Sequence, residues 1–125
     1  MAYVYFNNNP TGRVSAGDCA VRAVSKALGV DWETAYLLIA VNGFQMGNVI
    51  SANETWGSVL RQHGFHRENL PMFCKDCYSV ADFARDNNKG TYVVGTNNHA
   101  VCIIDGNWYD AWNSKDEVPQ FFWTK

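Results

Sequence analysis

Cys19 lies at the start of a stretch whose pattern predicts a reactive thiol. From Gly17 to Gly29 the sequence reads GDCAVRAVSKALG, and its apolar residues recur at helical spacing. Asp18 suits the N-cap of this helix and Gly29 its C-terminal stop. Cys19 is then in the first turn, where free backbone N–H groups and the positive end of the helix dipole favour a thiolate. The alternative is a buried cysteine that only packs.

A histidine and an aspartate far downstream could complete a catalytic site. Asp105-Gly106 predicts a two-residue hairpin turn, which sets Ile103 opposite Trp108. Strand alternation then places His99 and Asp110 on one face as diagonal neighbours, with Cα atoms roughly 7–8 Å apart. An aspartate in that position orients an imidazole, which acts as a base toward a thiol. The alternative is a polar pair at a strand end without a catalytic role.

The elements that must position these residues divide the chain into a helical part and a strand part. Helices are expected over residues 18–28, 32–41, 53–63 and 79–86. Strands are expected over residues 91–96, 99–104, 107–112 and 117–123, the last at an edge because of Pro119. Residues 3–6 form a strand or an extended arm, and residues 44–52 and 65–78 are expected to be irregular. This order predicts an α+β fold with N-terminal helices packed on a C-terminal antiparallel sheet.

Length and composition narrow the possible functions. The 125 residues, 47% of them apolar, suit one domain over residues 1–125 whose core needs no metal or disulfide. The net charge of −2, with no basic run, gives no support for binding nucleic acid or an anionic membrane. We find no signal peptide and no apolar run of membrane-spanning length. We therefore expect a cytoplasmic protein whose four cysteines are thiols.

The order of three short motifs resembles the papain-like cysteine peptidase superfamily. The motifs are GDCAVRA, HAVCIIDG and WYDAW, and they span nearly the whole chain. They look most like the compact branch that contains the double-glycine leader peptidases of bacterial export systems, and are similar to small uncharacterised phage and bacterial proteins. The resemblance implies a papain-like fold, with Cys19 as nucleophile, His99 as general base and acid and Asp110 as orienting residue. It implies a protein or peptide substrate and no cofactor.

The sequence departs from this family at the position of the oxyanion donor. Such peptidases usually carry a glutamine six residues before the cysteine, where this chain has Arg13. Arg13 could itself donate hydrogen bonds, or an amide just upstream could do so, from Asn7, Asn8 or our preferred candidate Asn9. The backbone N–H of Cys19 would be the second donor. Trp112 is expected opposite His99, where it would line the cleft and shield the imidazole from water.

A second group of residues has the spacing of a metal site. His63, His66, Cys74 and Cys77 form the pattern H-x2-H-x7-C-x2-C, which could hold zinc in a tetrahedral set. The two cysteines could also be a redox pair. The simpler interpretation is two loop thiols and two surface histidines, because the predicted core is large enough without a metal.

Two classes of function follow. The first is a cysteine-dependent hydrolase, namely a peptidase, isopeptidase or amidase that forms an acyl-enzyme; acyl transfer to an amine is a related possibility. The second is a catalytically weak or inactive binding module of the same fold, encoded by a phage and acting on a host protein. The sequence does not indicate an oligomeric state.

Overall fold

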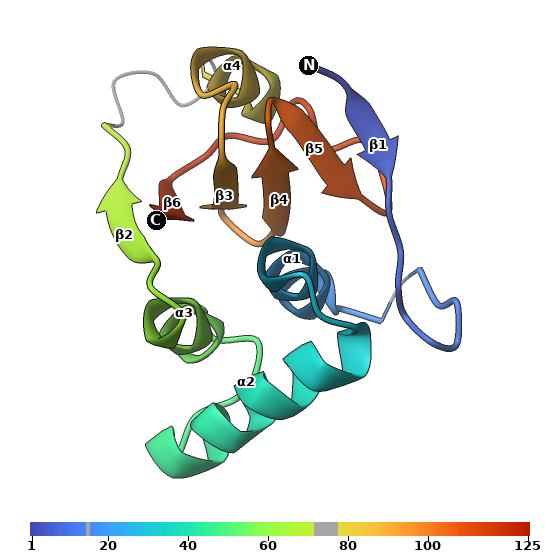
Figure 1. The fold of residues 1–125 in the computed structure, drawn as a ribbon, viewed down its shortest axis with the longest axis vertical. Coiled ribbons are helices and arrows are strands. Elements are labelled where there is room, and N and C mark those ends of the chain that lie inside the picture. Colours follow the sequence, from blue (N-terminus) through green and yellow to red (C-terminus); the bar gives the residue numbers. More distant parts are fainter. Residues whose placement is uncertain (15, 72–77) are drawn as a thin grey trace.

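The computed structural model describes residues 1–14, 16–71 and 78–125, and within these ranges the chain forms four helices and six strands (Figure 1). The helices are α1 (Cys19–Leu28), α2 (Trp32–Met46), α3 (Asn53–Gln62) and α4 (Val80–Asp86). The strands are β1 (Tyr3–Tyr5), β2 (His66–Asn69), β3 (Thr91–Gly95), β4 (Ala100–Ile104), β5 (Asn107–Asp110) and β6 (Phe121–Thr124). None of these helices has both the length and the apolar character needed to cross a membrane.

The six strands form one mixed sheet in the order β1-β5-β4-β3-β6-β2. Four of the five neighbouring pairs are antiparallel, but β1 pairs with β5 in parallel, with Tyr3 opposite Trp108. The α+β class is therefore confirmed, and the prediction of a wholly antiparallel sheet was wrong. The N-terminal segment pairs with the outer edge of β5, more than 100 residues along the chain, and a pattern within residues 3–6 does not reveal such a distant partner.

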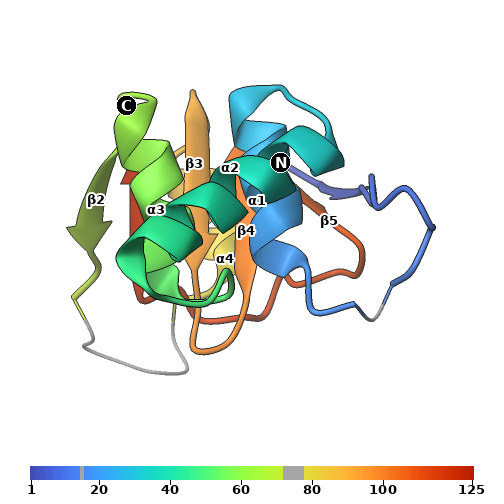
Figure 2. The ribbon, with the colours of Figure 1, turned by 90° about the horizontal axis from the view of Figure 1, so that it is seen from below.

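Helices cover both faces of the sheet. In Figure 2, α1, α2 and α3 lie in front of the sheet and α4 lies behind it. The alternation along β4 matches these two layers, because Ala100 and Cys102 join the apolar cluster of α1–α3 while Val101 and Ile103 join the cluster of α4. The layer of α1–α3 positions the candidate nucleophile.

Local signals account for the ends of three helices. α1 ends at Gly29, which has the left-handed conformation (φ 69°), and α3 ends near the predicted residue. α4 begins with the predicted capping box, in which Ser79 and Asp82 each accept a backbone N–H of the other. These ends depend on contacts within a few residues, so the sequence is enough to predict them.

α2 does not end at Val41 as predicted but continues to Met46, and Gly47 is its left-handed stop (φ 68°). Gly43 lies inside the helix, and the chain that follows α2 turns back and packs against it. A Cβ atom at Gly43 would lie 2.8 Å from the carbonyl oxygen of Asn48. This glycine therefore serves a close approach rather than a helix end.

The strand that contains Phe121–Thr124 is not an edge strand. β6 pairs with β3 on one side and with β2 on the other. Pro119 lies before the strand, so its missing N–H removes no bond of the ladder. The edge position belongs to β2, which was expected to be irregular. All four side chains of β2 are exposed, and such a strand has no apolar alternation to reveal it.

Candidate active site

The hairpin that carries the histidine and the aspartate has the predicted turn and register. Asp105 (φ 50°) and Gly106 (φ 80°) both have positive φ, as a tight two-residue turn requires. Ile103 pairs with Trp108, and the ladder stops one pair further on, at Cys102 and Tyr109.

His99 and Asp110 lie at the end of this ladder, where strand alternation no longer controls their direction. His99 immediately precedes β4, and Asp110 is the last residue of β5. Both contact residues of α1, whereas Val101 packs in the α4 cluster. His99 and Asp110 therefore meet as predicted, although the strand alternation from which this was predicted does not extend to them.

The carboxylate of Asp110 is buried and holds the imidazole. His99 Nε2 lies 2.6 Å from Asp110 Oδ2, which also accepts a hydrogen bond from Ser114 Oγ at 2.7 Å. Asp110 Oδ1 accepts from Arg22 at 2.9 Å and from the N–H of Ala111 at 2.8 Å. Burial raises the pKa of Asp110, but hydrogen bonds from His99 and Ser114 and the charges of His99 and Arg22 lower it below its ordinary value. Asp110 is therefore ionised at neutral pH.

Cys19, the first residue of α1, is a neighbour of the same imidazole. Because Nε2 is bonded to Asp110, Nδ1 is the ring nitrogen that remains for the thiol. Burial raises the pKa of Cys19. The hydrogen bond and charge of His99, the N–H of Ala100 and the charge of Arg22 lower it, and the net shift is downward.

The imidazole shifts in the opposite direction. Burial lowers the pKa of His99, but its hydrogen bonds to Asp110 and Cys19 and the charges of both partners raise it to about 9. A raised histidine pKa next to a lowered thiol pKa favours the thiolate–imidazolium form of the pair over its neutral form. This is the charge state of an activated nucleophile.

Asp18 occupies the N-cap position of α1, but its side chain makes no capping hydrogen bond, contrary to the prediction. Its carboxylate instead accepts hydrogen bonds from Arg22 Nη1 at 3.0 Å, Trp32 Nε1 at 2.9 Å and Asn9 Nδ2 at 3.2 Å. Three donors compete with the backbone for this carboxylate, and two of them come from outside α1.

Arg22 joins the two ends of the site. Its guanidinium bonds Asp18 through Nη1 and Asp110 through Nη2, and the residue is only 4% exposed. The spacing of Asp18 and Arg22 is a sequence signal for their pairing on a helix. The bridge to Asp110 and the hydrogen bond from Ser114 have no such signal, and sequence reasoning missed both.

The other residues predicted near the site have different environments. Trp112 lies beside the imidazole, with its ring centroid 4.7 Å from that of His99, and is 45% exposed. Asn9 is nearly buried and donates to Asp18. Arg13 is exposed, and its carbonyl accepts from Asn7 at 3.1 Å. The role of Asn9 or Arg13 as oxyanion donor stays a prediction.

The two histidines of the predicted zinc set have separate local partners. His63 Nδ1 lies 2.8 Å from the carbonyl oxygen of Val59, and His66 Nε2 lies 2.9 Å from Glu68 Oε2. Cys74 and Cys77 lie outside the described residues, so the set as a whole stays untested. Within residues 1–14, 16–71 and 78–125, no three or more His, Cys, Asp or Glu side chains are grouped as metal ligands.

The described site has the parts that nucleophilic catalysis needs: a thiol at a helix start, an imidazole beside it and a buried carboxylate that orients the ring. Comparisons of the chain with protein-family models, curated proteins and solved structures found no match. The functional argument therefore depends on the geometry and chemistry of this site.

Proposed function

We propose that this protein is a papain-like, cysteine-dependent hydrolase that cleaves amide bonds in a protein or peptide through an acyl-enzyme. The observation that carries the proposal is the position of His99, which is hydrogen-bonded to the buried Asp110 and is close enough to Cys19 that each of the two groups shifts the pKa of the other. A cysteine that only packs would have its pKa raised by burial, and Cys19 has a lowered pKa. The proposed location is the cytoplasm, where a thiol stays reduced.

The proposed reaction has two steps. In the first, the Cys19 thiolate forms a bond to the carbonyl carbon, the C–N bond breaks, and the His99 imidazolium gives its proton to the leaving amine. In the second, a water molecule attacks the thioester, His99 takes a proton from the water, and the C–S bond breaks to release the acid. Asp110 keeps the ring oriented and stabilises its charged form in both steps.

The start of α1 also suits the stabilisation of an oxyanion. The first N–H groups of a helix have no partner within the helix. The Asp18 side chain makes no cap bond, so it does not accept a hydrogen bond from these first N–H groups. The N–H of Cys19 is therefore suited to donate to the negative charge that develops on the carbonyl oxygen. A lost oxyanion donor costs roughly 2.7–4 kcal/mol of transition-state stabilisation, so this N–H matters to the proposed rate.

The test is the rate of Cys19 alkylation by iodoacetamide as a function of pH, followed by mass spectrometry of the labelled peptides. We expect Cys19 to react at pH 6 about a hundredfold faster than in His99→Ala, whose thiol keeps the cost of burial without the imidazole that lowers its pKa. Cys102 in the same samples is the internal control, because burial raises its pKa to about 12. A Cys19 that reacts at pH 6 no faster than an ordinary thiol would falsify the proposal.

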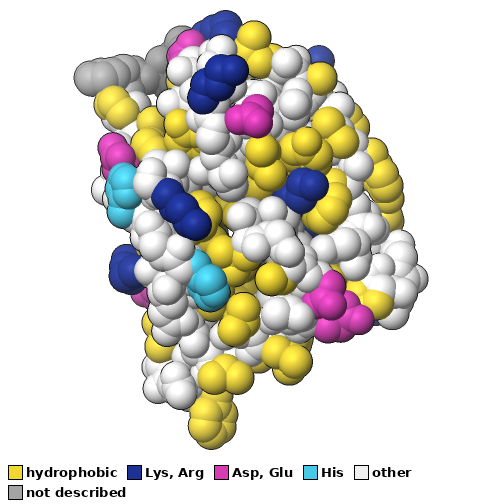
Figure 3. Space-filling model, viewed as in Figure 1, with side chains coloured by type: hydrophobic (Ala, Val, Ile, Leu, Met, Phe, Trp, Pro, Cys, Tyr) yellow, Lys and Arg dark blue, Asp and Glu magenta, His cyan; other side chains and the backbone are white. Residues whose placement is uncertain are grey.

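Two observations favour a second candidate, a binding module that keeps the fold without the activity. The Asn9 amide, our preferred oxyanion donor, is bonded to Asp18. In addition, α2 exposes large apolar side chains, with Leu37 63%, Val41 53% and Phe44 89% exposed. Hydrophobic side chains are visible on the surface at the α2 end of the molecule (Figure 3). If Cys19 is unreactive in the alkylation experiment, the binding module becomes the preferred function in place of the hydrolase.

A further inference from the structure

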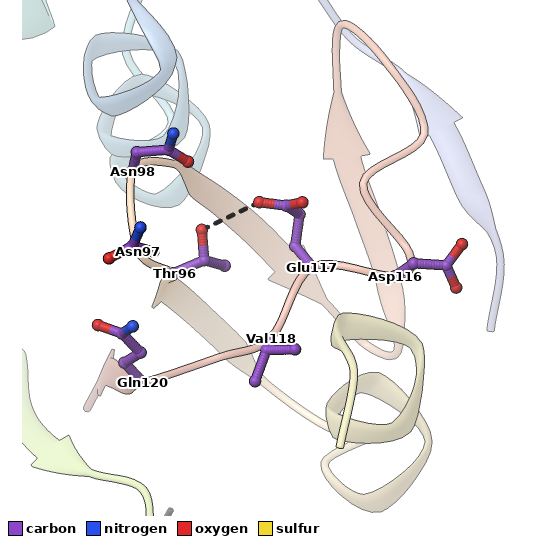
Figure 4. Close-up of a pocket in the computed structure, with 7 residues that line it drawn as sticks. All are labelled: Thr96, Asn97, Asn98, Asp116, Glu117, Val118 and Gln120. Carbon is purple, nitrogen blue, oxygen red and sulfur yellow. Dashed lines mark hydrogen bonds between the residues drawn. The ribbon is translucent and has the colours of Figure 1, made fainter. Parts of the chain in front are cut away.

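A surface hollow of about 510 Å³ lies next to the candidate active site. It is formed by the turn between β3 and β4 and by the segment that leads into β6, and it is lined by Thr96, Asn97, Asn98, Asp116, Glu117, Val118 and Gln120 (Figure 4). Its volume is within the range of sites that enclose small ligands, roughly 300–1,000 Å³. It is therefore large enough for one long amino-acid side chain.

The chemistry of the lining favours a positively charged group. The lining residues of the hollow include two carboxylates, Asp116 and Glu117, and no lysine or arginine. In Figure 4 the Glu117 carboxylate is turned toward Thr96 and Asn98, whereas Asp116 lies at the outer end. Three amide side chains supply further carbonyl acceptors, and Val118 supplies an apolar surface for a methylene chain.

Glu117 has a fixed position in this hollow. Thr96, which is 4% exposed, has its hydroxyl 3.3 Å from Glu117 Oε1. The N–H of Glu117 donates to Ser114 at 3.1 Å, and Ser114 is also a hydrogen-bond donor to Asp110. The carboxylate thus contacts the hydroxyl of buried Thr96, and the backbone of Glu117 is held by Ser114, which lowers the entropy lost when the carboxylate binds a partner.

The hollow is connected to the catalytic base. The N–H of Thr96 donates to the carbonyl of His99 at 2.8 Å, and Asn98 is the residue before His99. The leaving amine receives its proton from His99 and therefore departs on the imidazole side of the thiol. Because Thr96 and Asn98 adjoin His99, a hollow on this side of the imidazole would receive the part of the substrate that leaves.

We propose that this hollow binds the cationic side chain of a lysine or arginine on the leaving-group side of the cleaved bond, with Glu117 as its main partner. This inference rests on the proposed hydrolase function and narrows the substrate to a peptide with a basic residue after the cleavage point. Asp116, which is more exposed than Glu117, adds a weaker attraction for the same cation.

The first test compares chloroacetamides that differ only in the charge of their tails. N-(4-aminobutyl)chloroacetamide is cationic, N-(4-hydroxybutyl)chloroacetamide is neutral and N-(3-carboxypropyl)chloroacetamide is anionic. In each case the thiolate forms an S–C bond and chloride leaves. We expect the cationic probe to alkylate Cys19 about tenfold faster than the neutral probe at low salt, and the anionic probe to be slowest.

The ratio of the cationic to the neutral rate is compared across variants, so that a general change in thiol reactivity cancels. We expect Glu117→Gln to bring the ratio near one and Asp116→Asn to lower it less. Glu33→Gln, which removes an exposed charge from the first turn of α2, should keep the wild-type ratio. A wild-type ratio of one, or a ratio that Glu117→Gln leaves unchanged, overturns the inference.

The second test does not depend on chemistry at Cys19. Nα-acetyl-lysine-N-methylamide is titrated into Cys19→Ala protein while the side-chain amide signals of Asn97, Asn98 and Gln120 are followed by NMR. We expect saturable shifts with the lysine compound, none with the norleucine analogue and none in the added Glu117→Gln variant. Equal responses to the two compounds overturn the inference, whereas failure of the hydrolase proposal is recognised separately by slow labelling with iodoacetamide.

Discussion

Cys19 and Cys102 belong to the same apolar cluster, yet their thiols have opposite properties. Cys102 lies within β4 and is 0% exposed, and burial raises its pKa to about 12 although the charge of Lys26 lowers it slightly. Cys19 lies at the start of α1 and is also partly buried, but its pKa is lowered. The hydrogen bond and charge of His99 outweigh the cost of burial there.

The comparison shows that a thiol is activated where charged and polar partners offset its burial, as they do at the end of the sheet that α1 packs against. In the middle of β4 the backbone is fully paired and the neighbouring side chains are apolar. Just before β4 begins, the ladder with β5 has ended, and polar groups from α1, β5 and the following loop meet. A strand end thus provides both the burial and the charged partners that a perturbed pKa requires.

Replacement of Arg22 should have the largest effect on stability, because it removes the buried cation that pairs with two carboxylates in the Cys19 region. Within the described part of the chain, the Cys102 region has no such ion pair to lose. Arg22→Met leaves the buried carboxylates of Asp18 and Asp110 without their shared partner. We expect a loss of about 3–5 kcal/mol in the free energy of unfolding, measured by urea denaturation. Arg85→Met removes an exposed arginine that is paired with Asp82 and should leave the unfolding midpoint nearly unchanged. Equal effects of the two variants would contradict the role of Arg22.

Replacement of Asp110 by asparagine should have a smaller effect, because the shape of the side chain is kept and only its charge is lost. In Asp110→Asn we expect the pKa of His99 to fall from about 9 toward 6.5, as measured by NMR titration. Cys19 alkylation near pH 6 should slow roughly tenfold, equivalent to about 1.4 kcal/mol. Asp86→Asn, at an exposed carboxylate of α4, is the matched control.

The pKa shifts of His99 and Asp110 also predict how the stability difference between wild type and Asp110→Asn depends on pH. The raised pKa of His99 stabilises the fold fully below pH 6.5, and this contribution is lost as pH rises through about 9. The lowered pKa of Asp110 stabilises the fold above pH 3.8, and this contribution is lost as pH falls through the lowered value. The difference in unfolding free energy between wild type and Asp110→Asn should therefore be largest between pH 3.8 and 6.5 and decrease on both sides. A difference that does not vary with pH would argue against the ion pair.

Replacement of Cys102 should have the smallest effect and would sharpen the comparison. Cys102→Ala removes a buried sulfur that contacts only the core, so we expect a loss of about 1 kcal/mol in stability. The pH profile of Cys19 alkylation should be the same as in the wild type. If the profile moves, the two thiols are coupled, and the division between the strand end and the strand centre is incorrect.

The elements predicted well from sequence are those that local contacts determine. The capping box at Ser79 and the Asp105-Gly106 turn each involve residues within a few positions of one another. The elements missed depend on distant partners. The strand at His66–Asn69 has four exposed side chains and exists because it pairs with β6. Gly43 looks like a helix end in the sequence, but its reason for being glycine is the carbonyl of Asn48.

The sequence alone determined that a thiol stands at a helix start and that a histidine and an aspartate stand at the ends of two adjacent strands, because helical periodicity and the two-residue turn are short-range effects. Only the tertiary structure decided that the start of α1 meets these strand ends and which charged groups surround them. Arg22 reaches Asp110 across 88 residues, and Ser114 reaches it from a loop without a regular pattern. Such contacts depend on how α1 packs against the sheet, and no spacing within the chain specifies that packing.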